Sequence, residues 1–256
     1  EFFEQAPLKS EARSPGAKTR YGAYKIFTDG SLGARTAALT APYSDDPGNT
    51  GILCDPEVLK GAVAEACQRG MQPAIHAIGD RAMEATLHAI ENAVKAFPEI
   101  LTTPDRPPFR IIHAQMVTDE QLQRIKALPI VLDIQPIFLS TDLYWVEDRL
   151  GSERLGIAYR WKSMMDQGVR MTGGSDCPVE SYDPLPGIFA AAARQDLKGY
   201  PPCGWQPQEK LSVYEAFCLF SKNIPYANGE QGLLGTLELG KFGDLVVLNQ
   251  DPFGVD

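Results

Sequence analysis

The sequence predicts an α/β protein in which helices flank a parallel β-sheet. Short apolar runs alternate with segments of helical spacing along most of the chain, and this β-α alternation is typical of a parallel sheet with helices outside it. The composition is that of a globular protein, with 44% hydrophobic and 22% charged residues. A chain of 256 residues is long enough to bury a substantial core.

Five short apolar runs are the candidate strands, and each has a length typical of a strand. They are Tyr24–Thr28, Gln72–His76, Phe109–His113, Ile130–Ile134 and Val169–Thr172.

The clearest helical segment is Arg81–Phe97, whose apolar residues recur at alternating steps of four and three. His88 lies beside this apolar stripe, so we interpret it as an ordinary helix histidine and exclude it from any site. We expect Asp80 to cap this helix. A second helix is expected from Thr118 to Leu128, where Thr118 and Gln121 have the spacing of a capping box.

The C-terminal segment differs from the rest of the chain. Gly232–Phe253 contains several glycines and one compact apolar run, Asp244–Leu248, which predicts a small β structure after the last helix. We therefore divide the chain into a main body, residues 1–232, and a β segment, residues 233–256.

Charge and cysteine content limit the partners and the compartment. The formal net charge is -9 and no Lys/Arg run exceeds two residues, which argues against nucleic acid as a partner. The five cysteines are scattered without a C-x-x-C pair, so a reducing, cytoplasmic setting is expected. No apolar run is long enough to span a membrane, and the first 14 residues do not form a signal peptide. We expect a small-molecule substrate as partner and leave a homo-oligomer open.

Residues suited to chemistry recur where the candidate strands end. These residues are Lys25, Asp29, His76, His113, Gln135 and Asp176. Parallel strands carry active sites at their carboxyl ends, and imidazole and carboxylate groups together suit a divalent metal such as zinc. Two histidines in this position, with an acid after a later strand, favour a site over coincidence.

Each of these residues also has a simpler interpretation. His76 alone is either a ligand or a buried polar group, and its recurrence as His113 strengthens the ligand hypothesis for both. Asp176, in TGGSDCP, either forms an Asx turn or helix cap, or binds a metal and accepts a proton from water. Lys25 either extends its ammonium group to the strand end, or is a desolvated amine that adds carbon dioxide to become a carbamate. Glu180, Asp183 and Arg194 could contact substrate, but surface charge is the simpler interpretation.

Five motifs, in order, resemble one known family. They are KIFTDGSLGARTAAL (25–39), AIHAIGDRA (74–82), RIIHAQ (110–115), the stretch 142–188 that contains TGGSDCP, and GTLELGKFGDLVVLNQDPF (235–253). Together they are similar to the YtcJ-like (amidohydrolase 3) branch of the metal-dependent amidohydrolase superfamily, over nearly all of the chain from about Tyr24 onwards.

The resemblance implies a (β/α)8 TIM barrel of the amidohydrolase type, of which this chain holds about strands 4–8, with part of a small β-sandwich at the C-terminus. It implies one or two divalent metals, zinc above all, held by Lys25, His76, His113 and Asp176. Lys25 is the candidate for carbamylation, and Asp176 would also be the general base. The implied activity is hydrolysis of C–N bonds, in amides or cyclic amides, through a metal-activated water.

One departure from the family pattern is large. The family carries an H-x-H pair on its first strand, and no H-x-H is present here. We therefore expect the chain to be a fragment of a longer hydrolase, inactive by itself, because five strands of a barrel would leave exposed sheet edges. The alternative is a non-catalytic binding or regulatory protein on a degenerate barrel. A different metal-assisted reaction, such as decarboxylation or isomerisation, also remains open.

Overall fold

The computed structural model describes residues 22–103 and 106–254, so the first 21 residues of the predicted main body lie outside the described part. Within this part, five parallel strands form one sheet in the order β1-β2-β3-β4-β5, as the sequence predicted. The strands are β1 (Tyr24–Phe27), β2 (Pro73–Ala77), β3 (Phe109–His113), β4 (Ile130–Ile134) and β5 (Met171–Gly173).

The strands differ only slightly from the predicted ranges. β3 and β4 have the predicted bounds, and β2 is displaced by one residue toward Ala77. β5 begins two residues later than expected, at Met171, because Met171 is the first residue of this strand that pairs with β4, through Leu132.

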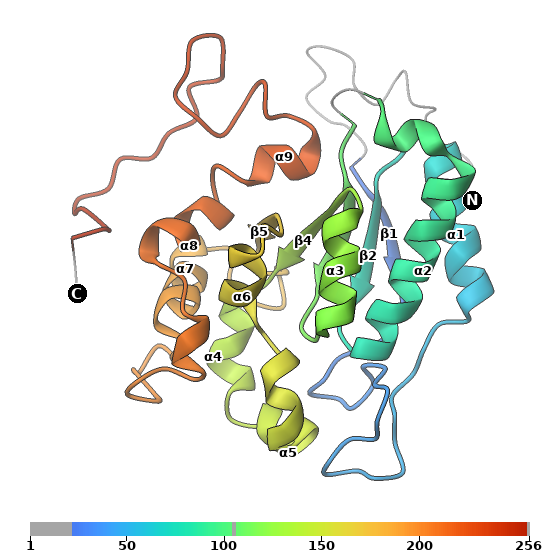
Figure 1. The fold of residues 1–256 in the computed structure, drawn as a ribbon. Coiled ribbons are helices and arrows are strands. Elements are labelled where there is room, and N and C mark those ends of the chain that lie inside the picture. Colours follow the sequence, from blue (N-terminus) through green and yellow to red (C-terminus); the bar gives the residue numbers. More distant parts are fainter. Residues whose placement is uncertain (1–21, 104–105, 255–256) are drawn as a thin grey trace.

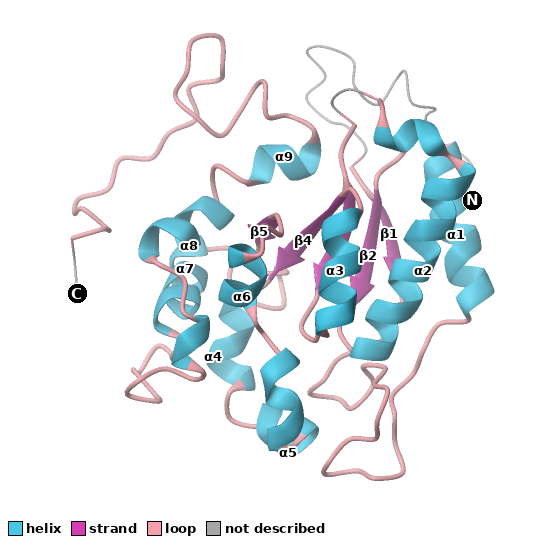
Figure 2. Ribbon diagram, viewed as in Figure 1, coloured by secondary structure: helices cyan, strands magenta, loops and turns pink. Residues whose placement is uncertain are grey.

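Helices cover one face of the sheet and both ends of it (Figures 1 and 2). α1, α2 and α3 lie against the first strands, α5 lies at the carboxyl ends of the strands, and α9 lies at the opposite end. The α-helices are α1 (Pro56–Gln68), α2 (Asp80–Ala96), α3 (Asp119–Ala127), α4 (Leu139–Asp142), α5 (Val146–Leu150), α6 (Trp161–Asp166), α7 (Pro184–Ala193), α8 (Val213–Leu219) and α9 (Ile224–Asn228). The short 3-10 helices are η1 (Pro98–Leu101), η2 (Pro136–Phe138), η3 (Ser152–Ile157) and η4 (Pro207–Glu209).

The two faces of the sheet differ in chemistry. Side chains alternate between the faces of a strand, and the helix-covered face carries Ile75, Ile111 and Leu132, all fully buried. The opposite face carries Lys25 and Phe27 on β1, both exposed, and the charged side chains of β3 and β4. The helix-covered face therefore forms the core. The opposite face is mixed, because Ala74, Val131 and Thr172 on it are buried while Lys25 and Phe27 are exposed.

Two helices confirm their local sequence signals. α2 matches the predicted Arg81–Phe97 to within one residue at each end, and His88 is exposed and contacts Glu84, as expected of a helix histidine off the apolar stripe. α3 begins with the predicted capping box of Thr118 and Gln121.

The expected cap of α2 by Asp80 is wrong. Asp80 is the first residue inside the helix, and its Oδ1 accepts a hydrogen bond from the Thr40 backbone N–H instead, at 2.9 Å. The carbonyl oxygen of Ala38 accepts from the N–H groups of Arg81 and Ala82 at the helix start. A neighbouring loop thus satisfies the free N–H groups that a capping side chain would otherwise satisfy.

The strand expected at Asp244–Leu248 is also absent from the described residues. Residues 229–254 contain no helix or strand, and Leu245, Val246 and Val247 are 66%, 77% and 86% exposed. A strand exists only where its backbone pairs with another strand, and none of the described residues pairs with this run. The division of the chain at residue 232 stays a prediction. Among the described residues, no helix has the length and apolar character needed to cross a membrane.

Candidate metal centre

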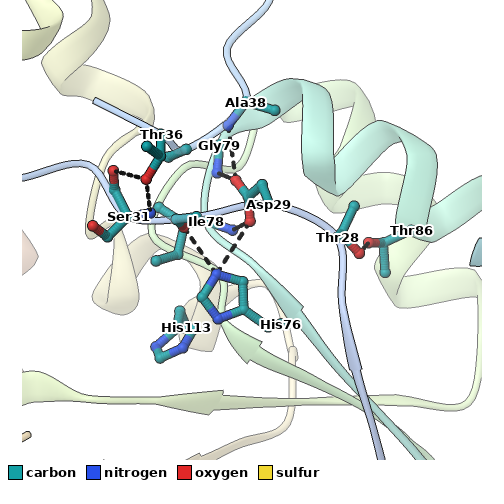
Figure 3. Close-up of polar contacts among 12 residues, drawn as sticks. Thr28, Asp29, Ser31, Thr36, Ala38, His76, Ile78, Gly79, Thr86 and His113 are labelled. Atoms are coloured by element: carbon teal, nitrogen blue, oxygen red, sulfur yellow. Dashed lines mark hydrogen bonds and ion pairs between the residues drawn. The ribbon is translucent and has the colours of Figure 1, made fainter. Parts of the chain in front are cut away.

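Two histidines from neighbouring strands meet at the carboxyl ends of the sheet (Figure 3). His76 lies on β2 and His113 is the last residue of β3. Their ring centroids are 4.5 Å apart and the ring planes are close to perpendicular, at 74°. Both side chains are buried, so the pair is held within the protein.

The backbone of His113 makes this meeting possible. In the sheet register His113 pairs with Ala77, and His76 pairs with Ile112, so regular alternation would place the two imidazoles on opposite faces. His113 instead has φ 76° and Ala114 has φ 46°. This left-handed conformation, which non-glycine residues rarely adopt, ends the alternation and accompanies the contact of His113 with His76.

The surroundings of His76 determine which of its ring nitrogens carries a proton. Nε2 lies 2.9 Å from the carbonyl oxygen of Gly30 and 3.3 Å from Oδ1 of Asp29. Both neighbours can only accept a hydrogen bond, so Nε2 is the donor. In the neutral ring, Nδ1 therefore keeps its lone pair.

Asp29 holds the loop after β1 against the turn that follows β2. Its carboxylate accepts hydrogen bonds from the backbone N–H groups of Ala38 (2.9 Å), Ile78 (3.1 Å) and Gly79 (2.9 Å), as Figure 3 shows. The two backbone segments lie so close together that a Cβ at Gly79 would be 1.9 Å from the Ala38 carbonyl oxygen. Sequence analysis identified Asp29 as a residue at a strand end but assigned it no role. The Asp29-Gly30 pair, which is typical of a turn, was the signal that could have indicated its contacts with backbone N–H groups.

His113 is enclosed more tightly than His76. Its Nδ1 lies 2.6 Å from Oε1 of Gln135, and its ring stacks on Phe138 with a centroid distance of 5.9 Å and a plane angle of 19°. Burial lowers the pKa of His113 to about 3, with further lowering by the charges of His76 and Lys25 and opposition from the Gln135 hydrogen bond. His113 is therefore neutral near pH 7, as a metal ligand must be.

Lys25 lies on the same face of the sheet, one layer before His76. It pairs in register with Ala74, and its Nζ lies 4.8 Å from the centroid of the Phe27 ring. The residue is exposed, yet desolvation of its amine lowers the pKa, while the charges of Asp176 and Asp133 oppose that shift. This direction is the one that the desolvated-amine interpretation requires, and the choice between the two interpretations of Lys25 stays a prediction.

Asp176 lies on an exposed turn after β5. Its backbone has φ 55°, and its carbonyl oxygen accepts a hydrogen bond from the N–H of Val179 at 2.9 Å. The turn therefore uses the main chain of Asp176 and not an Asx bond of its side chain. Among residues 22–103 and 106–254, no three His, Cys, Asp or Glu side chains come close enough together to hold a metal ion.

The two imidazoles fit a divalent metal, since each is fixed by a hydrogen bond on one nitrogen and leaves the other free. Lys25 and Asp176 interact electrostatically, but Asp176 forms no group of three His, Cys, Asp or Glu side chains with the two histidines. The described residues thus form two adjacent ligand positions and not a full coordination sphere.

Arg194 corrects a sequence interpretation. Surface charge was the simpler expectation, but its side chain is completely buried. Its guanidinium donates to the carbonyl oxygens of Trp205 (2.7 Å) and Tyr159 (3.0 Å) and lies against the rings of Trp161 and Trp205. Burial lowers its pKa to about 10. Arg194 therefore has a structural role, because two carbonyl groups and two indole rings take the place of the water that would otherwise solvate its guanidinium.

The loop after β1 is held by the segment that follows β4. Arg149 forms an ion pair with Asp45, and the Trp145 ring lies so close to Gly33 that a Cβ there would approach it to 3.3 Å. The segment around Trp145 is thus packed on the loop after β1, which contacts His76 through Gly30.

The chain matches the family model described as Amidohydrolase family over residues 2–256. It is 38% identical to YtcJ of Bacillus subtilis, named as an amidohydrolase, over 94% of this chain and 44% of that protein. It is 35% identical to the protein LONG AFTER FAR-RED 3 of Arabidopsis thaliana, over 91% of this chain and 39% of that one. It is 31% identical to N-substituted formamide deformylase of Arthrobacter pascens, over 91% of this chain and 41% of that one.

Solved structures give the same relationship. An uncharacterized metal-dependent hydrolase from Pyrococcus horikoshii OT3 superposes with a TM-score of 0.83 and 34% identity, covering 95% of this chain and 47% of that one. Another from Pyrococcus furiosus has a TM-score of 0.80 and 33% identity, covering 94% of this chain and 47% of that one. The chain spans less than half the length of these relatives, and its parallel sheet corresponds to part of an amidohydrolase-type barrel. The chain belongs to the amidohydrolase family.

Proposed function

We propose that this chain supplies the C-terminal half of the active site of a metal-dependent hydrolase that cleaves C–N bonds in amides or cyclic amides. The observation that carries the proposal is the buried pair of His76 and His113, fixed through opposite ring nitrogens at the carboxyl ends of adjacent strands. This chain alone is inactive in the proposal, because its described residues bring together two ligands only.

The proposed ligands are Lys25, His76, His113 and Asp176. A bound divalent ion, which we propose to be zinc, present once or twice, would polarise a carbonyl group and lower the pKa of a water molecule. The lowered pKa of Lys25 is consistent with a nucleophilic amine that could add carbon dioxide and become a carbamate.

Asp176 is the proposed general base. Its exposed carboxylate, on a turn beside the strand ends, would accept a proton from the attacking water and pass it to the leaving nitrogen as the C–N bond breaks. The choice of C–N bonds is supported by the name of one relative, the N-substituted formamide deformylase, which states an amide as its substrate. The proposal includes a small-molecule substrate and a cytoplasmic location, and it allows a homo-oligomer.

The substitution Asp176→Asn in the full-length protein tests the assigned base. We expect hydrolysis of a panel of N-substituted formamides and cyclic amides to fall by about 10²–10⁴-fold, while metal content, measured by elemental analysis, is largely retained. Asp148→Asn on α5 is the matched control, because it is an exposed carboxylate that makes the same charge change. Near-wild-type hydrolysis by Asp176→Asn would remove Asp176 from the role of base.

A further inference from the structure

Gln135, the residue directly after β4, is placed to control the imidazole of His113. The residue is 6% exposed, and its amide contacts two groups in different parts of the sheet. Oε1 lies 2.6 Å from Nδ1 of His113, and Nε2 donates to the carbonyl oxygen of Asp133 at 2.8 Å.

The Asp133 carbonyl determines which way the amide of Gln135 points. A carbonyl oxygen can only accept, so the NH₂ group of Gln135 must face it. If the amide were flipped, Oε1 of Gln135 would face the Asp133 carbonyl oxygen, and neither oxygen has a proton to donate. The amide oxygen must therefore face His113, and Nδ1 of His113 must be the donor.

Ring contacts determine the plane of the same imidazole. Phe138 stacks on one face of His113, and the ring of His76 approaches it edge-on. A ring held in its plane by aromatic contacts can still carry its proton on either nitrogen. The hydrogen bond to Gln135 removes that freedom, because only one nitrogen faces the amide oxygen.

We propose that Gln135 is a positioning residue that holds His113 in the tautomer protonated on Nδ1, so that Nε2 is available as a ligand. The first half of this inference concerns the metal-free protein, and the second half rests on the proposed metal site. Residues that orient a ligating histidine in this way typically change metal affinity by about 10–100-fold when replaced.

Two variants separate the hydrogen bond from the packing. Gln135→Met keeps an unbranched side chain of similar length and removes both the acceptor and the donor. Gln135→Glu keeps an acceptor oxygen toward His113. Gln123→Met is the matched control, because Gln123 is an exposed glutamine on α3 whose amide donates to Gln167.

The first measurement is the ¹⁵N chemical shift of the His113 imidazole in the metal-free, full-length protein, assigned by comparison with His113→Gln. The wild type and Gln123→Met should show the Nδ1–H tautomer. Gln135→Met should shift toward the Nε2–H tautomer, and Gln135→Glu should keep the proton on Nδ1. A wild-type ring protonated on Nε2, or a folded Gln135→Met protein with an unchanged shift, would overturn the inference.

The second measurement is the affinity for Zn²⁺, determined by competition with a chelating dye. We expect Gln135→Met to weaken it by about 10–100-fold, and Gln123→Met to leave it unchanged. If His113→Gln binds Zn²⁺ as well as the wild type, the proposed metal site itself is wrong. If His113→Gln loses affinity while Gln135→Met keeps both its tautomer and its affinity, the site stands and the role of Gln135 is wrong.

Discussion

Asp142 is a carboxyl group that the fold keeps out of water. It is 8% exposed, and its Oδ2 accepts hydrogen bonds from the hydroxyl of Tyr159 at 2.6 Å and from Nε2 of Gln115 at 3.3 Å. Burial raises its pKa from 3.8 to about 6, and the hydrogen bond from Tyr159 opposes this rise. Near pH 6 the side chain is therefore close to half protonated in the folded protein.

This pKa predicts a pH-dependent stability. The folded state binds the Asp142 proton more tightly than the unfolded chain, so stability falls as pH rises from about 4 to about 6, and the loss persists above that range. The shift of about 2 pKa units corresponds to a change on the order of 3 kcal/mol. Asp142→Asn does not titrate, so its unfolding free energy relative to wild type should increase across this range in urea titrations.

Comparing Asp142→Asn with the wild type also removes the opposite pH dependence that His113 gives to the stability of both proteins. His113 has a lowered pKa, so its contribution to stability is lost as pH falls below about 6.5 toward 3. That contribution is present in both proteins and cancels in their difference. A difference in unfolding free energy that stays constant between about pH 4 and pH 7 would contradict a buried, titrating Asp142.

Single residues show which part of the site a sequence can reveal. The strand-end rule predicted that His76 and His113 would lie at one edge of the sheet, and the structure brings their rings together. It could not predict the role of Asp29, whose partners belong to loops that only the folded chain brings near. The burial of Arg194 could not be predicted, because the two indoles that enclose it, Trp161 and Trp205, are not its neighbours in the sequence.

At the scale of elements, Arg154 joins two loops at the carboxyl end of the sheet. From η3, its guanidinium donates to the carbonyl oxygens of Ala41 (3.0 Å) and Pro42 (2.7 Å) and to Oγ of Ser44 (3.1 Å). These three acceptors lie on the loop after β1, which also contacts His76 through Gly30. One side chain thus couples the segment after β4 to the surroundings of the histidine pair.

Replacing Arg154 by Met should loosen this connection without unfolding the sheet. The methionine keeps most of the apolar stem but none of the hydrogen bonds, so local opening becomes easier by about 1.4 kcal/mol or more. The amide of Ser44, which donates to the Arg149 carbonyl oxygen at 2.9 Å, should then exchange at least about 10-fold faster in hydrogen-exchange measurements. Glu153→Gln, on the same turn and exposed, is the control. Equal exchange at Ser44 in both variants would contradict this coupling.

Elements with local signals were predicted well and those with distant partners were not. The capping box of Thr118 and Gln121 specifies the start of α3 within four residues of sequence, and it is confirmed. The cap of α2 comes from the loop around Ala38, far away in the sequence, so Asp80 was misassigned. The run 244–248 has the composition of a strand, but composition does not supply the second strand that pairing requires.

At the scale of the whole molecule, exposed apolar residues are concentrated in the tail, residues 229–254. Leu237, Leu239, Leu245, Val246 and Val247 are each at least 66% exposed, and they lie in a segment that extends away from the helices (Figure 1). β1 and β5 are the first and last strands of the sheet, and within the described part no further strand pairs with their outer edges. Exposed edges and apolar runs favour association with other chains.

We therefore expect the 256-residue chain, prepared alone, to self-associate in a concentration-dependent way. The double substitution Leu239→Lys and Val247→Lys should reduce the mean particle mass measured by light scattering, because charge opposes pairing of apolar segments. Val58→Lys is the control, since Val58 is an isolated, 63% exposed residue on α1. A wild-type chain that stays monomeric at the highest concentration would contradict the expectation.

The fold class needed the least information. The alternation of apolar runs and helical segments was sufficient for the parallel sheet, because each unit is encoded within a short stretch of sequence. The family and its barrel could be predicted only from the five motifs. The family match over residues 2–256 confirms the family, and the likeness to solved structures confirms the part of an amidohydrolase-type barrel. The complete ligand set could not be obtained in this way, since the described residues bring together only two imidazoles.

The left-handed backbone at His113 and Ala114 also has a consequence for the height of the site. In a regular sheet the residues available to one face are all of one parity, so ligands on neighbouring strands can differ in height only by whole steps of two residues. His113 breaks the alternation, so its side chain reaches His76 from a backbone position one residue further along the strands. The backbone positions that carry the two imidazoles therefore differ by about 3.3 Å along the strands, an offset that regular alternation would not offer at this edge.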